Sequence, residues 1–346
     1  MTPLPTVTAS EFRDTFLKVR TEIGRVVVGQ ERAIEHLLAA LFAGGHVLLT
    51  GVPGLGRTLL VKTLAQALGL DYRRMQFTPD LLPTDILGTE VLQHDPASGS
   101  RNFRFFKGPI FANLVLVDEI NRAPTRTQSA LLEVMQERQV TSSGQTFFLP
   151  KPFTLIATEN SLDTEGVWRL GEAQVDRFLM AIEQTYPGEN DERRMIHQTT
   201  GHTPPEIVAV TTPEMVQAMQ ALARDVPVPP SVRDFALALV RGSRPDEPEA
   251  PAGLRERVRL GASPRASQAL LLGGKVLALS RGRTHVSKQD VVDIARPVLA
   301  HRLLLDVRAQ SEGLTPAMLL DELLEHAHKH SLRPRSYWTR DLLPTR

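Results

Sequence analysis

The chain has 346 residues, of which 42% are hydrophobic and 23% are charged. These proportions are ordinary for a globular protein, and the length allows about two compact domains. Forty basic and 39 acidic residues give a net charge of +1, so no overall attraction to nucleic acid or anionic membranes is expected. The absence of cysteine excludes disulfides, thiolate metal sites and cysteine nucleophiles.

The N-terminus has neither the basic stretch nor the apolar stretch of a secretion signal. No uninterrupted apolar run approaches the ~18 residues that a membrane helix needs. Together with the absence of cysteine, these features favour a soluble, cytoplasmic protein without membrane insertion.

Two amphipathic helices are predicted at the start of the chain. Thr8 and Glu11 have the spacing of a capping box, and apolar residues then recur at helical intervals until Gly24. The second helix ends at Gly44 and Gly45. Its apolar positions are Ile34, Leu37, Leu38, Leu41 and Phe42.

Five short apolar runs follow, separated by helical patterns or turns, and they predict a parallel α/β sheet of about five strands. The runs cover residues 46–50, 73–77, 114–117, 153–157 and 178–182. Two hairpin-like insertions interrupt this pattern, at 90–106 around a turn at 95–100 and at 139–149 around Ser143 and Gly144. Both are expected to project from one rim of the sheet.

Strand signals fade after about residue 187, and helix-capping residues multiply. Caps are predicted at Thr212, Ser231, Ser263, Ser287 and Thr315. We therefore expect an α/β core over residues 1–187, an all-helical domain over 188–330 and a peripheral basic tail over 331–346.

Two details of the helical half are notable. The stretch 241–262 is rich in Pro, Arg and Glu and is expected to be an exposed loop. Gly273 and Gly274 stand inside one predicted helix and indicate either close packing or a break in that helix.

A phosphate-binding loop is indicated directly after the first predicted strand. Residues 51–58 read GVPGLGRT, which is the spacing of a P-loop, and they lead into a helical pattern. The glycines let the backbone wrap an anion, which meets free N–H groups and the positive end of the helix. Thr58 is placed to bind magnesium, and a plain turn is the competing interpretation. The residues expected to contact the nucleotide are Gly51, Pro53, Gly54, Leu55, Gly56, Arg57, Thr58 and Leu59.

Arg57 stands where a P-loop ordinarily has lysine. The exchange is not conservative, because lysine offers a compact ammonium whereas arginine brings a longer, planar, forked cation. Arginine still pairs with phosphate, so nucleotide binding is better supported by the sequence than hydrolysis is.

Two adjacent carboxylates end the third predicted strand. Asp118 and Glu119 follow the apolar run 114–117, at the edge where open α/β sheets bind ligands. A solvated turn is the alternative, but it explains adjacent acids after four apolar residues poorly. In phosphoryl transfer, Asp118 would orient magnesium through its water shell, and Glu119 would polarise the attacking water.

Three further polar residues are candidates. Asn160 follows the strand at 153–157 and could hold the lytic water or the γ-phosphate, or simply form a turn. Arg177 is either a surface cation or a finger that reaches the nucleotide of a neighbouring subunit. Arg265 lies in the first turn of a helix that starts at Ser263, where a cation opposes the helix dipole and a bound anion would relieve the conflict. An exposed arginine without a ligand is the alternative for Arg265.

Taken in order, these motifs resemble the MoxR family of AAA+ ATPases over about residues 27–305. The matching stretches are VVVGQE at 26–31, GVPGLGRT at 51–58, QFTPDLLPTDILGT at 76–89, GPIFANLVLVDEINRAPTRTQSALLEVMQERQVT at 108–141, EAQVDRFLM at 172–180 and GASPRA at 261–266. The resemblance implies an AAA+ P-loop core followed by a helical lid.

The same resemblance implies roles for individual residues. Thr58 would bind magnesium, and Asp118 and Glu119 would form the Walker B motif. The remaining catalytic residues would be Asn160 as sensor 1, Arg177 as the arginine finger and Arg265 as sensor 2. The residues near the adenine would be Val28, Gly29 and Gln30.

The two predicted hairpins resemble the helix-2 insert and the pre-sensor-1 hairpin of the AAA+ branch that includes magnesium-chelatase and MCM-like motors. Family members form rings, often hexamers, and act as chaperone-like factors with von Willebrand factor A domain partners. The resemblance therefore implies ATP and Mg²⁺ as cofactors, self-association, and a client protein complex. A DNA-processing motor is an alternative, but the sequence has no basic stripe or recognition motif, so nucleic acid is not expected as a partner.

Three departures from the family pattern bear on activity. Arg57 replaces the family's lysine, residues 167–171 read VWRLG instead of a Tyr-Pro-Leu-Pro-like run, and Ser161 replaces a proline. The leading hypothesis is a ring-forming remodeller that hydrolyses ATP, because all four catalytic candidates are retained. The alternative is a nucleotide-gated scaffold that binds ATP with little or no hydrolysis.

Overall fold

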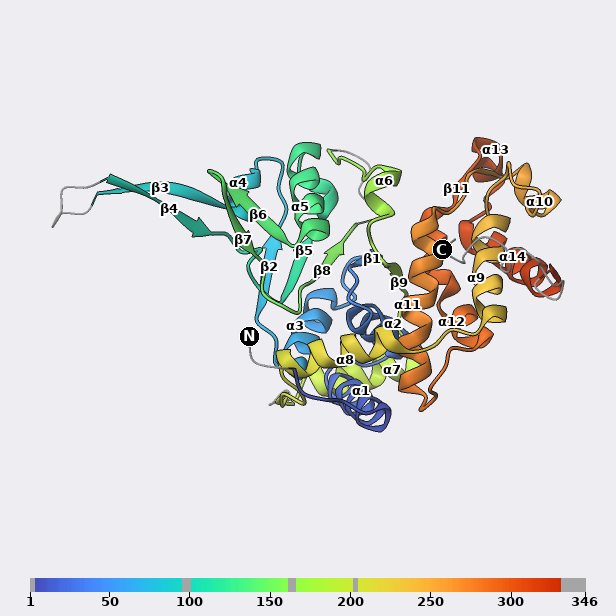
Figure 1. The fold of residues 1–346 in the computed structure, drawn as a ribbon, viewed down its shortest axis with the longest axis horizontal. Helices are drawn as coiled ribbons and strands as arrows, with labels where there is room; N and C mark the ends of the chain where they lie inside the picture. The colour runs from blue at the N-terminus through green and yellow to red at the C-terminus, as the bar shows by residue number, and fades with distance from the viewer. Residues whose placement is uncertain (1–3, 95–100, 161–165, 202–204, 331–346) are drawn as a thin grey trace, which may run out of the picture.

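A five-stranded parallel sheet lies at the centre of the computed structural model, which describes residues 4–94, 101–160, 166–201 and 205–330 (Figure 1). The strand order is β2-β5-β8-β1-β9. The strands are β1 (Val47–Gly51), β2 (Tyr72–Gln76), β5 (Leu114–Asp118), β8 (Thr154–Thr158) and β9 (Met180–Gln184). Each of them overlaps one of the five apolar runs in the sequence, so the prediction of a parallel α/β sheet is confirmed.

Helices cover both faces of this sheet. Alternate residues of one strand enter different cores, since Val47 and Leu49 pack with the N-terminal helices while Leu48 packs with α5 on the other face. Strands β5 and β8 are buried along their whole length, which explains why they read as continuous apolar runs. The helices of this half are α1 (Ala9–Gly24), α2 (Glu31–Phe42), α3 (Arg57–Leu68), α4 (Pro83–Leu87), η1 (Ile120–Arg122), α5 (Thr125–Glu137) and α6 (Glu172–Val175).

The first helix begins at the predicted capping box. Thr8 Oγ1 accepts from the Glu11 N–H at 3.2 Å, and Glu11 Oε2 accepts from the Thr8 N–H at 2.8 Å. Phe12 and Phe16 then pack against Phe42 of α2, which joins the first two helices in one core.

Both predicted hairpins are present and lie on the same side of the sheet (Figure 1). The first is formed by β3 (Gly88–His94) and β4 (Arg101–Lys107), and its turn at 95–100 lies outside the described residues. The second is formed by β6 (Gln139–Ser142) and β7 (Gln145–Phe148). The rings of Phe105 and Phe147 stack with centroids 4.4 Å apart, so the two hairpins support each other.

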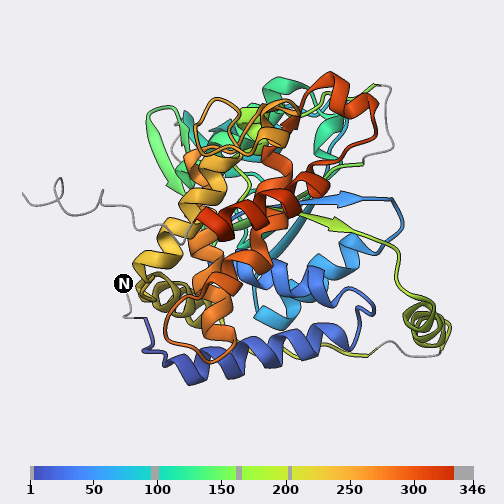
Figure 2. The same cartoon turned by 90° about the vertical axis from the view of Figure 1, so that its right-hand side faces the viewer.

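The second half of the chain is mainly helical, and its orange and red helices stand in front of the sheet in Figure 2. Thr212, Ser263 and Ser287 each cap a helix with a side-chain hydrogen bond, as predicted. Ser231 does not, because the N-cap of that helix is Pro229, two residues earlier, and Pro230 is its first residue. The helices are α7 (Glu189–Thr199), α8 (Pro213–Asp225), α9 (Pro230–Gly242), α10 (Ala252–Arg255), α11 (Pro264–Ser280), α12 (Lys288–Leu299), η2 (Ala300–Arg302), α13 (Val307–Ser311) and α14 (Pro316–His330).

The prediction of an exposed loop at 241–262 is wrong in part, because regular structure follows the loop formed by residues 243–251. Segment 241–262 contains α10 and β10 (Val258–Leu260), and β10 pairs with β11 (Leu304–Leu305) in a domain that was expected to be all helical. Leu254 and Val258 are buried, while Arg241 forms ion pairs with nearby glutamates. The composition misled because its charged residues neutralise one another locally and leave the apolar ones to pack.

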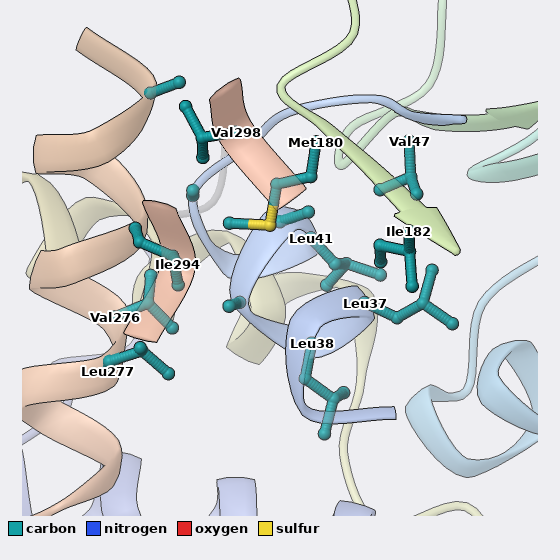
Figure 3. Close-up of a cluster of buried hydrophobic side chains, with 14 of the residues drawn as sticks. Leu37, Leu38, Leu41, Val47, Met180, Ile182, Val276, Leu277, Ile294 and Val298 are labelled. Atoms are coloured by element: carbon teal, nitrogen blue, oxygen red, sulfur yellow. The ribbon is translucent and has the colours of Figure 1, made fainter. Parts of the chain in front are cut away.

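The helical half shares a core with the sheet, as Figure 3 shows for Val276, Leu277, Ile294, Val298 and Met180. A Cβ atom on Gly273 would lie 2.7 Å from Ile294 Cδ1 and 2.9 Å from Met180 Cε. Because α11 is continuous through this position, the glycine pair marks close packing and not a break. Among the described residues, no helix combines the length and the apolar character needed to span a bilayer.

Candidate functional site

The P-loop sequence adopts the strand–loop–helix arrangement that its motif requires. Strand β1 ends at Gly51, and α3 begins at Arg57 with Gly56 at its N-cap. Gly54 and Gly56 have φ values of +86° and +71°, in the left-handed region that side chains disfavour. The loop therefore curls in front of the α3 N-terminus, where backbone N–H groups and the helix dipole favour an anion.

Asp118 and Thr58 come together beside this loop. Thr58 Oγ1 lies 3.4 Å from Asp118 Oδ2, and Thr158 Oγ1 of the neighbouring strand lies 3.2 Å from Asp118 Oδ1. Asp118 is nearly buried at the end of β5. Hydroxyl and carboxylate oxygens are the ligands that Mg²⁺ prefers, so these residues fit a magnesium site.

Glu119 occupies the next position in a left-handed backbone conformation, with φ of +58°. Its N–H donates to Thr158 Oγ1 at 3.0 Å. Its carboxylate accepts from Gln76 Nε2 at 2.9 Å and pairs with Arg122 Nε at 3.0 Å. A non-glycine residue in this region needs such support, and the strain points to a functional position.

These groups line one cavity of about 270 Å³. The P-loop, the acidic pair and Asn160 all line this cavity. The sequence motifs had placed these residues in one site. Leu59 is 46% exposed and is not among the lining residues of this cavity. The lining residues are Pro53, Gly54, Leu55, Gly56, Arg57, Thr58, Arg74, Gln76, Asp118, Glu119, Thr158 and Asn160.

The Arg57 guanidinium is bound to neutral groups. Its Nε donates to Gln184 Oε1 at 3.2 Å, Nη1 to the Glu159 carbonyl at 3.1 Å and Nη2 to the Val52 carbonyl at 3.3 Å. Burial lowers the pKa of Arg57, and the Asp118 carboxylate partly offsets this effect. The guanidinium of Arg57 is thus held against the protein at the edge of the cavity.

Arg74 and Gln76 of β2 also belong to the site, and the sequence motifs did not identify them. Arg74 Nε lies 2.6 Å from Asp118 Oδ2, and Gln76 lies opposite Asp118 in the parallel register of β2 and β5. Both residues are exposed on a strand whose next position, Met75, is buried. Polar residues two apart at the carboxyl end of a strand were the available signal.

A larger cavity of about 640 Å³ adjoins the sheet and extends to the helical half. Gly29 and Gln30 line one side of it, and Arg296 and His301 line the other. Its size suits a nucleoside. Val28 is buried and is not among the lining residues. Burial lowers the pKa of His301 well below its usual value.

Arg177 and Arg265 line neither of these cavities in the part of the chain that the structure describes. Arg177 lies in a separate hollow with Glu133 and Gln174. Arg265 Nη1 is 3.6 Å from Asp176 Oδ2, and Ser263 Oγ lies 2.8 Å from both oxygens of the same carboxylate. The anion that faces this helix start is therefore Asp176.

Asp176 also pairs with Arg302 of η2, and the Nε–Oδ1 distance is 2.8 Å. The Arg302 side chain is only 3% exposed and donates to the Phe178 carbonyl at 2.7 Å as well. Asp176 thus ties the segment that carries Arg177 to two parts of the helical half.

The P-loop, the acidic strand end and the helical lid together define an AAA+ ATPase. Residues 46–180 match the family described as "ATPase family associated with various cellular activities (AAA)", and residues 253–323 match the AAA lid domain. A solved structure of a candidate ATPase from Cytophaga hutchinsonii is 37% identical, with a TM-score of 0.84, over 92% of this chain and 96% of that one.

Two related proteins identify the family within the AAA+ ATPases. Chaperone MoxR1 of Mycobacterium tuberculosis is 41% identical over 88% of this chain and 79% of its own length. Protein MoxR of Methylorubrum extorquens is 30% identical over 86% of this chain and 90% of its own length. The chain belongs to the MoxR family.

Proposed function

We propose that this MoxR-type ATPase binds ATP with Mg²⁺ at the P-loop cavity and hydrolyses it. The observation that carries the proposal is the meeting of the P-loop with Thr58, Asp118 and Glu119 around one cavity. The phosphates would lie against the N-terminus of α3. The base and ribose would occupy the larger cavity, beside Gly29 and Gln30.

Each residue around the P-loop cavity has its own task in this proposal. Thr58 and Asp118 would hold Mg²⁺, which when bound neutralises charge on the phosphate oxygens. Glu119 would accept the proton of the attacking water. Asn160 would hold that water or the terminal phosphate by neutral hydrogen bonds.

The remaining parts of the proposal concern assembly. Arg177 lies in its own hollow, which suits a cation that serves the nucleotide of a neighbouring subunit. Arg265 would sense the nucleotide from the lid. We propose a core over residues 1–187, a lid over 188–330 and a cytoplasmic homo-oligomeric ring, specifically a hexamer. This ring would remodel client complexes together with a von Willebrand factor A domain protein, in keeping with a relative named as a chaperone.

A nucleotide-gated scaffold is the second candidate function, and Arg57 favours it. Three N–H groups of its guanidinium are engaged by neutral acceptors of the protein. An arginine held in this way would not offer these N–H groups to the terminal phosphate, so the P-loop backbone would bind the polyphosphate without this stabilisation of the transition state.

The deciding experiment measures steady-state ATPase activity with MgCl₂ for wild type, Arg57→Lys and Glu119→Gln, with ATP binding followed by calorimetry. For a hydrolase, wild type turns over ATP and Glu119→Gln binds ATP without turnover. For a scaffold, wild type binds ATP and only Arg57→Lys hydrolyses it. Equal turnover in Glu119→Gln and wild type would exclude Glu119 as the base.

The ring is tested with Arg177→Ala. A finger that acts in trans predicts lower turnover with unchanged nucleotide affinity, and a wild-type activity per subunit that rises with protein concentration. Activity independent of concentration across the range in which the protein associates would exclude a trans finger.

A further inference from the structure

Arg74 holds the buried carboxylate of Asp118 in this structure. The two side chains are 50% and 9% exposed, so the arginine is half in water while the aspartate is fixed in the protein. Arg74 Nη2 also lies 3.4 Å from Gln76 Oε1. Because the Arg74 side chain is half exposed, water can solvate its guanidinium when it moves, and the Asp118 carboxylate keeps its contacts with Thr58 and Thr158.

Arg57 is placed less favourably for contact with a nucleotide. Its three hydrogen bonds reach Val52 just after β1, Glu159 just after β8 and Gln184 at the end of β9. To point its fork at a phosphate it would have to break them, and the partly buried acceptors would lose their donors. Arg74 would have to break one ion pair and its 3.4 Å contact with Gln76.

Binding of Mg²⁺ at Asp118 would disfavour the present position of the Arg74 guanidinium. With the magnesium ion bound at Asp118, the Arg74 guanidinium faces a like charge near the oxygen that it now contacts. Arg74 lines the same cavity as Gly54 and Gly56 of the P-loop, where the phosphates are expected. A terminal phosphate bound in this cavity would therefore offer the displaced cation a new anionic partner.

We infer that Arg74 is a catalytic residue of this site. It neutralises Asp118 in the nucleotide-free protein and donates to the terminal phosphate in the loaded protein, which is the task of lysine in other P-loops. Its departure also breaks the contact with Gln76, the residue that holds Glu119. The inference rests on the proposed function, because it requires nucleotide in this cavity.

The test compares Arg74→Ala with Arg73→Ala. Arg73 is the preceding residue on β2, is also exposed, and points to the opposite face of the strand, so it is a matched control. Calorimetry measures affinities for ADP and for the β,γ-imido analogue of ATP, each with MgCl₂. Arg74→Ala should weaken binding of the analogue about tenfold and leave ADP within about twofold, because a charge-assisted bond to the terminal phosphate is lost.

A second measurement is the dependence of ADP binding on the MgCl₂ concentration. The MgCl₂ concentration that gives half-maximal ADP binding should fall in Arg74→Ala, because the competing guanidinium has been removed from Asp118. In the double variant Arg57→Lys with Arg74→Ala, the lysine should restore most of the affinity for the analogue.

Other outcomes would overturn the inference. If Arg57→Ala abolishes the preference for the analogue and Arg74→Ala behaves as Arg73→Ala does, the terminal phosphate belongs to Arg57. If wild type binds both nucleotides and Arg74→Ala has the same ratio of affinities for the analogue and for ADP, only the inference about Arg74 is overturned. A wild-type protein that binds neither nucleotide overturns the proposed function as well.

Discussion

Two aspartate–arginine pairs in this molecule have nearly the same length and different surroundings. Arg74 meets Asp118 at 2.6 Å beside the P-loop, and Arg302 meets Asp176 at 2.8 Å between the sheet and the lid. Arg74 is half exposed, whereas Arg302 is almost completely buried. Arg302 also donates to backbone carbonyls, among them those of Phe178 and Val298.

The comparison shows that the N–O distance of an ion pair does not by itself distinguish a structural contact from one that can be exchanged. A buried cation that serves several acceptors cannot leave without stranding them, so it acts as part of the fold. A half-exposed cation exchanges one partner for water or for a ligand at low cost. Four predictions test this contrast.

Removal of the buried cation should have the largest effect. Arg302→Met removes the buried cation beside Asp176, which keeps its contacts with Ser263 and Arg265, and it leaves several backbone carbonyls without their donor. We expect a loss of about 3–5 kcal/mol in the free energy of unfolding. Urea denaturation measures it. The control is Arg259→Met, which breaks a lid-to-core pair with Glu172 whose side chains are 63% and 59% exposed. A similar loss in both variants would contradict the contrast.

His46 shows what burial does to a group that has no opposite charge to hold it. Burial lowers its pKa from 6.5 to about 4, with Arg138 contributing. The unfolded chain therefore binds more protons between these values, and stability falls as the pH drops from about 6.5 to 4, by up to about 3 kcal/mol. His46→Gln should flatten this part of the profile of unfolding free energy against pH. An unchanged profile would assign the acid sensitivity elsewhere.

The lid helix should respond moderately to loss of its cap. Ser263 Oγ accepts from the Arg265 N–H at 3.1 Å and donates to Asp176. Ser263→Ala should cost about 1–2 kcal/mol, as measured by thermal or urea unfolding. Ser263→Thr, which keeps the hydroxyl, should recover most of that loss, and a failure to recover it would point to packing instead.

Loss of the exposed cation should have the smallest effect on stability. Arg74→Ala is expected to change the free energy of unfolding by less than about 1 kcal/mol, no more than Arg73→Ala does. A loss as large as that of Arg302→Met would show that Arg74 is a structural joint. The contrast between the two pairs would then disappear.

Local patterns in the sequence were sufficient for most of the fold. The five strands followed from short apolar runs, and the caps at Thr8, Thr212, Ser263 and Ser287 followed from residue type and spacing. Segment 241–262 was misread because average composition does not reveal which of its residues pack inward. The β10–β11 pair depends on a partner more than forty residues away, which no local pattern contains.

The candidate site was predicted in part for the same reason. The P-loop and the acidic pair stand in contiguous motifs, and the sheet brings them to one rim with Asn160. Only the register of β2 against β5 places Arg74 and Gln76 beside the acidic pair. Asp176 gains its meaning from contacts with the lid, which lies far along the chain. Roles that depend on tertiary pairing were therefore missed.

The glycine contact between α11 and β9 limits how the lid can move. Gly273 brings the α11 backbone against Met180 and Ile294 with no room for a methyl group. Rotation of the lid away from the sheet would separate this buried apolar contact, whereas sliding of α11 along β9 would preserve it. This packing therefore favours shear over a hinge at the junction of α11 with β9, because shear keeps the apolar core closed.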